Sequence, residues 1–148
     1  MIRSYDPADW SAVRTIYDIA KPDEIRGSVP LDLILALDDD PEMLALFRAS
    51  EIIVAEVEGE VAGFAGNKGN YIAWLFVHPH HRRRGIASAL IRSVVARLDG
   101  VATLNVATGN TAARQLYERL GFVIEHQFEG RFRGHPCNVM RLRHEPSG

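Results

Sequence analysis

The chain has 148 residues, of which 47% are apolar and 24% are charged, as is usual for one soluble globular domain. Its 17 Lys and Arg and 19 Asp and Glu give a net charge of -2, so it lacks the global basic field that nucleic-acid binding requires. Cys137 is the only cysteine, which excludes an internal disulfide and paired-cysteine metal sites. With no run of signal-peptide or membrane-spanning length, we expect a single cytoplasmic domain over residues 1–148, without a membrane or nucleic-acid partner.

The first third of the chain is predicted to be mainly helical after an initial strand. In chain order, the expected elements are a strand over 2–5, a helix over 7–20, a loop over 21–29, and short helices over 30–37 and 41–49. The first helix has apolar residues at helical spacing, and Asp6-Pro7 provides a cap and a first turn. Pro22 and Gly27 are the reasons for predicting a loop after it.

From residue 52 onward, strands and helices alternate. The expected elements are strands over 52–57, 61–65 and 71–77, a helix over 85–98, a strand over 103–107, a helix over 111–120, and strands over 122–128 and 138–143. The segment Tyr71 to Val77 is apolar on both faces, which indicates a central position in the sheet. This order predicts an α/β (α+β) fold: a mixed, partly antiparallel sheet with helices on its faces.

A basic loop opens the helix predicted after residue 84. Its sequence is Arg82-Arg83-Arg84-Gly85-Ile86-Ala87-Ser88. The N–H groups of a first helical turn lack partners, glycine lets a ligand approach the backbone, and arginines suit phosphate. These features favour a pyrophosphate site. The alternative is a solvated arginine cluster, and the two common nucleotide-loop patterns are both absent.

A second motif lies on the helix predicted over residues 111–120. Asn110 is a natural N-cap, and Ala113 and Tyr117 lie four residues apart on one helix face. The small alanine side chain would let a ligand lie against that face. Taken separately, Asn110 also fits a plain cap and Tyr117 a core aromatic.

Together, these segments resemble the GNAT superfamily of acyl-CoA-dependent N-acyltransferases. The matching patterns are Val77-His78-Pro79, Arg82-x-x-Gly85-x-Ala87 and Asn110-x-x-Ala113-x-x-x-Tyr117-x-x-x-Gly121-Phe122. The element order resembles the family over nearly the whole chain, most tightly from Leu75 to Phe122. The resemblance implies a mostly antiparallel central sheet, flanked by helices, in which two central strands splay apart.

The resemblance also implies a reaction and a set of residues. Acetyl-CoA would be the acyl donor, an amine of a small molecule, peptide or protein the acceptor, and no metal would be needed. Residues implied to bind the cofactor are Leu75, Phe76, Val77, Arg82, Arg83, Arg84, Gly85, Ile86, Ala87, Ser88, Asn110, Ala113 and Tyr117. Tyr117 is also the implied catalytic residue, placed to protonate or position the leaving thiolate.

Several points stay open at this level. The group that deprotonates the acceptor amine could be any of Glu24, Glu51, Glu56, His78 or His81. The resemblance puts the acceptor pocket between residues 21–30 and 128–136. The basic, aromatic loop 129–135 could attract an acidic acceptor or be a solvated turn. His78, His80 and His81 are interpreted as loop residues and not as metal ligands.

Two other classes of function compete with an acetyltransferase. One is a non-catalytic sensor of the same fold that binds an acyl-CoA. The other is a nucleic-acid module using residues 80–84, which the acidic net charge argues against. The acceptor, the use of larger acyl groups and the oligomeric state, with a homodimer among the options, are not determined by the sequence.

Overall fold

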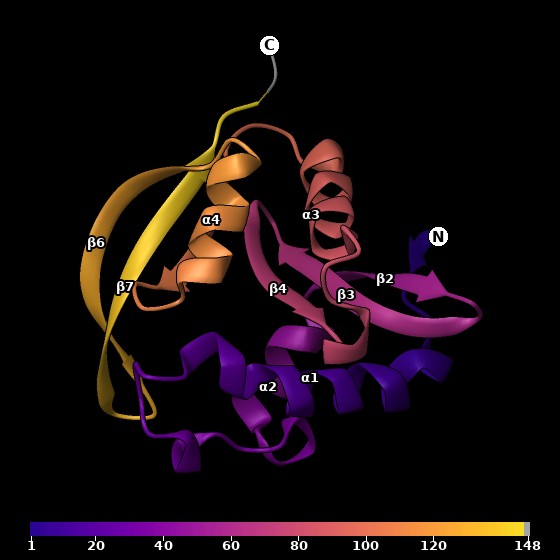
Figure 1. The fold of residues 1–148 in the computed structure, drawn as a ribbon, viewed down its shortest axis with the longest axis horizontal. Helices are drawn as coiled ribbons and strands as arrows, with labels where there is room; N and C mark the ends of the chain where they lie inside the picture. The colour runs from indigo at the N-terminus through magenta and orange to yellow at the C-terminus, as the bar shows by residue number, and fades with distance from the viewer. Residues whose placement is uncertain (147–148) are drawn as a thin grey trace.

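The computed structural model describes residues 1–146, in which helices cover both faces of a seven-stranded sheet (Figure 1). The strands are β1 (Ile2–Ser4), β2 (Glu51–Val57), β3 (Glu60–Lys68), β4 (Tyr71–Val77), β5 (Ala102–Ala107), β6 (Val123–Phe132) and β7 (His135–His144). The helices are α1 (Trp10–Ile25), α2 (Pro41–Arg48), α3 (Ile86–Arg97) and α4 (Thr111–Arg119), with short 3-10 turns between them. None of the described helices is long and apolar enough to cross a membrane.

The sheet has the strand order β1-β2-β3-β4-β5-β7-β6, which confirms the expected mixed, mostly antiparallel architecture. The central position predicted for residues 71–77 is also confirmed, because β4 lies between β3 and β5. Among the described strands, β4 and β5 form the one parallel pair, and it consists of a single register position, Tyr71 opposite Thr103. Beyond that point the two strands diverge, which is the expected splay.

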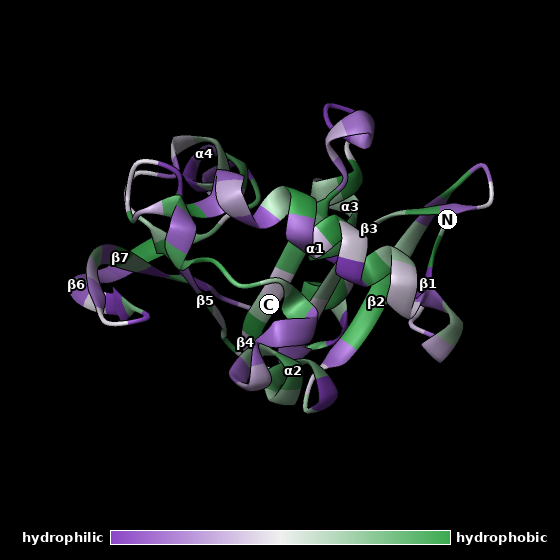
Figure 2. Cartoon of the chain, turned by 90° about the horizontal axis from the view of Figure 1, so that it is seen from below, coloured by the Kyte–Doolittle hydropathy of each residue, from purple (hydrophilic) through white to green (hydrophobic). Residues whose placement is uncertain are grey.

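Each face of the sheet has its own apolar core. One core packs α3 and α4 against the sheet through Leu90, Ile91, Val94 and Tyr117. The other packs α1 and α2 and is rich in aromatic rings: Tyr17, Phe47, Phe64, Trp74 and Phe76. Figure 2 shows α1 with alternating hydrophilic and hydrophobic segments, as expected for a helix that lies on a sheet. The central strands are therefore buried between two helical layers.

Two predictions for the N-terminal third are wrong. The loop expected over 21–29 is helical as far as Ile25, and Pro22 lies inside α1. The helix expected over 30–37 is replaced by two separate 3-10 turns, Leu31–Leu33 and Leu37–Asp39. Extended backbone between these turns takes Leu37 to full burial, where its N–H donates to Asp18 Oδ1 at 2.9 Å. Tertiary packing outweighs local propensity in both segments.

The final two strands are longer than predicted. β6 runs to Phe132 and β7 starts at His135, so most of the loop expected over 129–135 is strand. The two residues between them, Arg133 and Gly134, have φ values of 48° and 85°. Positive φ at both central positions is the signature of a tight type I′ hairpin. A tight hairpin end therefore stands where a longer loop was expected.

Candidate functional site

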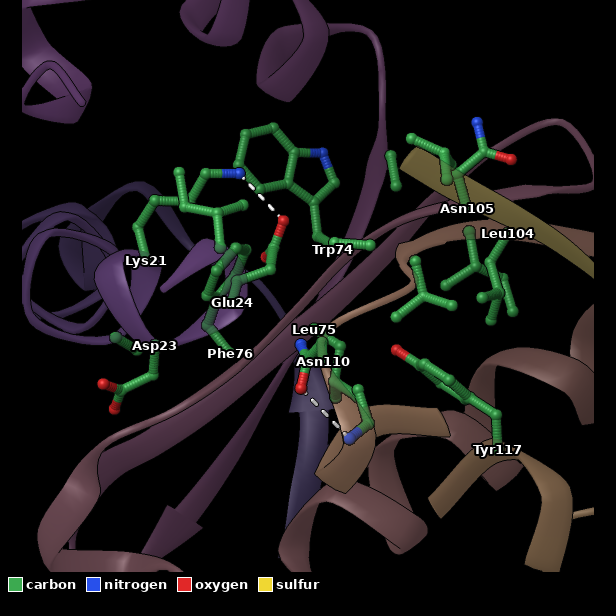
Figure 3. A pocket seen from close by; sticks show the side chains of 18 of the residues that line it. Lys21, Asp23, Glu24, Trp74, Leu75, Phe76, Leu104, Asn105, Asn110 and Tyr117 are labelled. Carbon is green, nitrogen blue, oxygen red and sulfur yellow. Dashed lines mark hydrogen bonds and ion pairs between the residues drawn. The ribbon is translucent and has the colours of Figure 1, made fainter. Parts of the chain in front are cut away.

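The divergence of β4 from β5 opens a cavity of about 730 Å³, a size usual for ligand sites (Figure 3). Its walls come from the second half of α1, from α2, from β4 and β5, from the loop and first turn of α3, from α4 and from the β6–β7 hairpin. Segments 21–25 and 128–132, which belong to the two regions expected to form the acceptor pocket, both contribute lining residues. The cavity therefore brings together parts of the chain that are distant in the sequence.

Eight of the 13 residues predicted to bind the cofactor line this cavity. They are Leu75, Phe76, Val77, Arg82, Ala87, Asn110, Ala113 and Tyr117. The other five do not line it: Arg83, Arg84, Gly85, Ile86 and Ser88. Four of these five lie in sequence between the lining residues Arg82 and Ala87, and Ser88 follows directly. The two predicted motifs are thus brought to one site, although not every member faces it.

Within residues 1–146, no strand pairs with one edge of β4 along most of its length. The N–H of His78, directly after β4, donates to the carbonyl of Ala62 in β3 at 2.8 Å. Backbone groups alternate from one side of a strand to the other, so the amides of Leu75 and Val77 face away from β3. That is the side from which β5 has diverged. These amides are available to a ligand that lies along β4.

The first turn of α3 has the properties of an anion site. Gly85 is its N-cap with φ of 75°. Among the described residues, no side chain caps the helix and no atom lies within 4 Å of the place of a Cβ at Gly85. Arg83 also adopts a positive φ, 65°. The backbone is therefore open to a ligand at the point where three N–H groups lack helical partners.

Arg82 connects this turn to α1. Its Nη1 donates to Asp23 Oδ2 at 2.7 Å, and Asp23 also bonds Arg26 at 3.3 Å. The Arg82 guanidinium, through its hydrogen bond, holds the pKa of Asp23 below its usual range. One arginine of the predicted phosphate loop is thus held by a carboxylate in this structure.

Asn110 and Tyr117 lie on the cavity side of α4. Asn110 Oδ1 accepts the Ala113 N–H at 3.2 Å, so Asn110 caps the helix and also lines the cavity. Tyr117 is 8% exposed, packs edge-on against Phe122, and points its hydroxyl into the cavity (Figure 3). Burial raises the Tyr117 pKa far above its usual value, so the hydroxyl keeps its proton. After α4, Gly121 has φ of 95°, as its predicted capping role requires.

A charged pair that the sequence analysis did not recognise lies on α1. Lys21 Nζ is 2.9 Å from Glu24 Oε1, and both residues line the cavity (Figure 3). The Lys21 side chain is only 9% exposed, whereas that of Glu24 is 38% exposed. The Lys21 ammonium also lies 5.6–5.9 Å from the ring centres of Tyr17, Phe76 and Phe132. A buried cation and a carboxylate therefore share the α1 side of the cavity.

Of the five residues considered as the base, Glu24 alone lines the cavity. Glu51 lies 3.7 Å from Arg97, and Glu56 bonds Arg3 at 2.8 Å. The ring of His78 accepts the His80 N–H within the turn after β4. Among residues 1–146, no three or more His, Cys, Asp or Glu side chains are grouped to hold a metal ion.

The pair was missed because Pro22 was interpreted as a helix end. A usable signal was present: Lys21 and Glu24 are three residues apart, and Tyr17, Ala20 and Glu24 continue one helical face. A helix extended by one turn would have placed both charges beside the buried stripe.

The sequence is similar to those of known acetyltransferases. The family described as the acetyltransferase (GNAT) domain matches residues 48–124. An acetyltransferase of Pectobacterium atrosepticum is 32% identical over 133 residues, covering 82% of this chain and 86% of the relative. A mycothiol acetyltransferase of Parafrankia sp. is 35% identical over 126 residues, covering 82% of this chain but only 38% of that protein.

Solved structures show the same fold at lower sequence identity. An acetyltransferase structure from Salmonella typhimurium, solved with its cofactor acetyl-CoA, superposes with a TM-score of 0.77 at 21% identity. The match covers 100% of this chain and 94% of that one. The seven-stranded architecture and its splayed centre are therefore those of a known fold.

Proposed function

The chain belongs to the GNAT acetyltransferase family, and from that premise we propose that it transfers the acetyl group of acetyl-CoA to an amine by direct attack in a ternary complex. One observation carries the proposal. The free edge of β4, Tyr117 and the carboxylate of Glu24 line a single cavity, and so do residues of the loop that opens α3. We further propose that residues 1–148 act as one catalytic domain in the cytoplasm, since the buried lone thiol of Cys137 suits a reducing compartment.

The residues present fit the donor. The open backbone at Gly85 and the uncapped start of α3 suit its pyrophosphate, with Arg82 and its neighbours supplying positive charge. The outward amides of Leu75 and Val77 suit its extended pantetheine arm, which Asn110 and Ala113 would flank from α4. When bound, acetyl-CoA supplies an activated thioester whose acetyl carbon accepts the amine and whose thiol leaves.

Glu24 is the proposed general base. Two carboxylates line the cavity, Asp23 and Glu24. Asp23 is paired with Arg82 of the predicted phosphate loop, whereas Lys21 holds Glu24 at 2.9 Å. The role of Glu24 is to take one proton from the acceptor ammonium, so that the nitrogen lone pair is free to attack. The second proton lost by the nitrogen on collapse of the adduct goes to the departing thiolate. Glu24 then returns its proton to water at the cavity mouth, which its partial exposure allows.

Tyr117 and the β4 amides stabilise charge as the reaction proceeds. An amide of Leu75 or Val77 donates to the carbonyl oxygen as it becomes negative. The Tyr117 hydroxyl donates a hydrogen bond to the sulfur. Because burial raises the Tyr117 pKa far above that of a thiol, it stabilises the thiolate by this bond and does not give up its proton.

Two measurements on the same protein test this function. Coenzyme A should raise the melting temperature, because it binds only the folded state. Free thiol should then be released from acetyl-CoA faster with a suitable amine than without it, across a panel of amino acids, polyamines and peptides. Thermal stabilisation without amine-dependent thiol release would instead identify an acyl-CoA sensor, and a flat calorimetric titration with coenzyme A would exclude both.

A further inference from the structure

We propose that the acetyl acceptor is an amine that also carries an anionic group such as a carboxylate, and that Lys21 binds this group beside Glu24. The inference rests on the proposed function and specifies the class of acceptor. It assigns to Lys21 a role in recognition, distinct from the role of Glu24 in proton transfer.

The Lys21 ammonium is buried, yet within the described residues most of its N–H donors are not hydrogen-bonded. Lysine side chains are almost never buried unless paired, and this one is 9% exposed. An ammonium has three N–H donors, and within residues 1–146 Lys21 uses one, to Glu24 Oε1. The rings of Tyr17, Phe76 and Phe132 surround it at 5.6–5.9 Å and stabilise the cation without accepting an ordinary hydrogen bond. The ammonium therefore keeps donor capacity inside the cavity that it lines.

The proposed proton transfer changes the surroundings of this cation. Before transfer, the Glu24 carboxylate compensates the charge of Lys21. Once Glu24 has taken the amine proton it is neutral, and Lys21 becomes a buried charge without a counter-ion, which is strongly unfavourable. An anion on the acceptor itself would keep Lys21 paired throughout. The activation free energy of acetyl transfer should therefore be lower for acceptors with such an anion than for neutral or purely cationic amines.

The remaining charged residues of the cavity also favour an acceptor that carries an anionic group. Five charged residues line it: Lys21, Asp23, Glu24, Arg82 and Arg131. Asp23 pairs with Arg82, and Glu24 pairs with Lys21. Arg131 has one hydrogen bond within the described chain, to the Gly134 carbonyl at 3.1 Å. Each pair is neutral overall and Arg131 remains positive. The part of the cavity between segments 21–25 and 128–132 therefore favours an acceptor with a negative group over one with a second ammonium.

Matched acceptors test this inference directly. Each amino acid of a panel is compared with the amine made by removing its carboxylate, which keeps the side chain and leaves a primary amine. For the best pair, we expect the carboxylate-bearing member to have at least a tenfold higher kcat/KM with the wild-type protein. Equal values for the two members of every pair would overturn the inference.

Substitution of Lys21 tests whether this residue causes the preference for the carboxylate-bearing acceptor. Lys21→Met keeps an unbranched side chain of similar length and removes the charge, so the preference within each pair should fall toward one. Lys68→Met is the matched control: Lys68 is the only other lysine, is exposed at the end of β3 and does not line the cavity. It should keep the wild-type preference.

Three further results would decide whether Lys21 binds the anionic group of the acceptor. If Lys21→Met slowed both members of a pair equally and shifted the pH profile of kcat/KM, Lys21 would act only on Glu24, and the inference would be wrong. If the variant failed to fold in a thermal melt, the wild-type ratio would still decide. Turnover of amines without any preference overturns this inference alone, whereas absence of turnover with every amine overturns the proposed function and this inference with it.

Discussion

Arg3 and Lys21 are two partly or fully buried cations that differ in how many of their N–H donors the protein itself hydrogen-bonds. Arg3 donates all five of its guanidinium N–H groups: to Asp9, Glu56 and the Ser4 carbonyl. Lys21 uses one of three within the described residues. The Arg3 cluster ties β1 to β2 and to the turn before α1, and none of its members lines the cavity. The Lys21 pair lies inside the cavity.

The difference separates structural charges from functional ones. When the protein itself satisfies every donor of a buried cation, the charge serves the fold, and removing a partner should cost stability. A cation that keeps free donors facing a cavity is satisfied only when a ligand arrives. Substitutions in the two clusters should therefore separate stability from catalysis.

The largest expected effect is the loss of the general base. Glu24→Gln keeps the shape of the side chain and an oxygen for Lys21, but it cannot accept the proton of the amine. Because general-base catalysis contributes about a hundredfold or more, kcat should fall by at least that factor. Glu56→Gln is the matched control in the Arg3 cluster and should change the melting temperature without changing kcat. Steady-state kinetics and melts of both variants test this, and equal loss of activity in the two would abolish the distinction.

A smaller effect is expected at Tyr117, which lies in the cavity but carries no charge. Tyr117→Phe removes one hydrogen bond to the departing thiolate. Hydrogen bonds to charged groups are worth about 1.5–3 kcal/mol, so the transfer rate should fall roughly tenfold to a hundredfold. The ring contact with Phe122 remains, so acetyl-CoA affinity and the melting temperature should change little. Single-turnover kinetics measures the step, and an unchanged rate would remove Tyr117 from the chemistry.

Substitution of Gly85 tests whether the start of α3 binds the cofactor. At φ of 75° most side chains are strained, so a change to glutamate would confound strain with charge. Asn and Asp both tolerate this conformation and have the same shape. Relative to Gly85→Asn, Gly85→Asp should weaken coenzyme A binding about tenfold, or about 1.4 kcal/mol, because it places a carboxylate beside the pyrophosphate. Calorimetric titration of the two variants measures this, and equal affinities would contradict a phosphate site there.

The parts of the fold that the sequence predicted correctly are those that local chemistry determines. The apolar segment Tyr71 to Val77 is the central strand, Asn110 caps α4, and Gly121 ends it. The end of α1 was predicted wrongly, because the rule that proline ends a helix is weaker here than burial. Ile25 packs with Val29 and Cys137 in a small core, which holds the last turn in place.

The candidate site was predictable only in part, for a similar reason. Motifs contiguous in sequence could be recognised in the residues themselves, as in the loop before α3 and on the face of α4. The cavity instead arises because β4 and β5 pair at one position and then separate, and residues of α1 and the last hairpin meet across it. The helical face shared by Tyr17, Ala20 and Glu24 could place Glu24 beside the buried stripe of α1, but no local pattern shows that this stripe meets the cavity. The choice of Glu24 over Glu51 and Glu56 therefore required the structure.

On the structural side of the comparison, at Asp9, we expect an effect on stability alone and the smallest effect on activity. Asp9 is 8% exposed and accepts two hydrogen bonds from Arg3 and one from the Asp6 N–H. Asp9→Asn keeps the shape but loses the charge, which should cost about 1–2 kcal/mol at pH 7 and lower the melting temperature by several degrees. Acetyl transfer and coenzyme A affinity should be unchanged, because Asp9 does not line the cavity.

The pH dependence of this loss tests its cause. The hydrogen bonds from Arg3 hold the pKa of the Asp9 carboxyl below its ordinary value of 3.8. A carboxyl whose pKa is lower in the folded than in the unfolded state stabilises the fold above the unfolded pKa, and this contribution is lost as the pH falls through the folded pKa. The difference in melting temperature between the wild type and Asp9→Asn should therefore be constant near neutral pH and shrink below about pH 4. A difference that stayed the same down to pH 2 would mean that the charge of Asp9 contributes nothing and that hydrogen-bond geometry alone accounts for the loss.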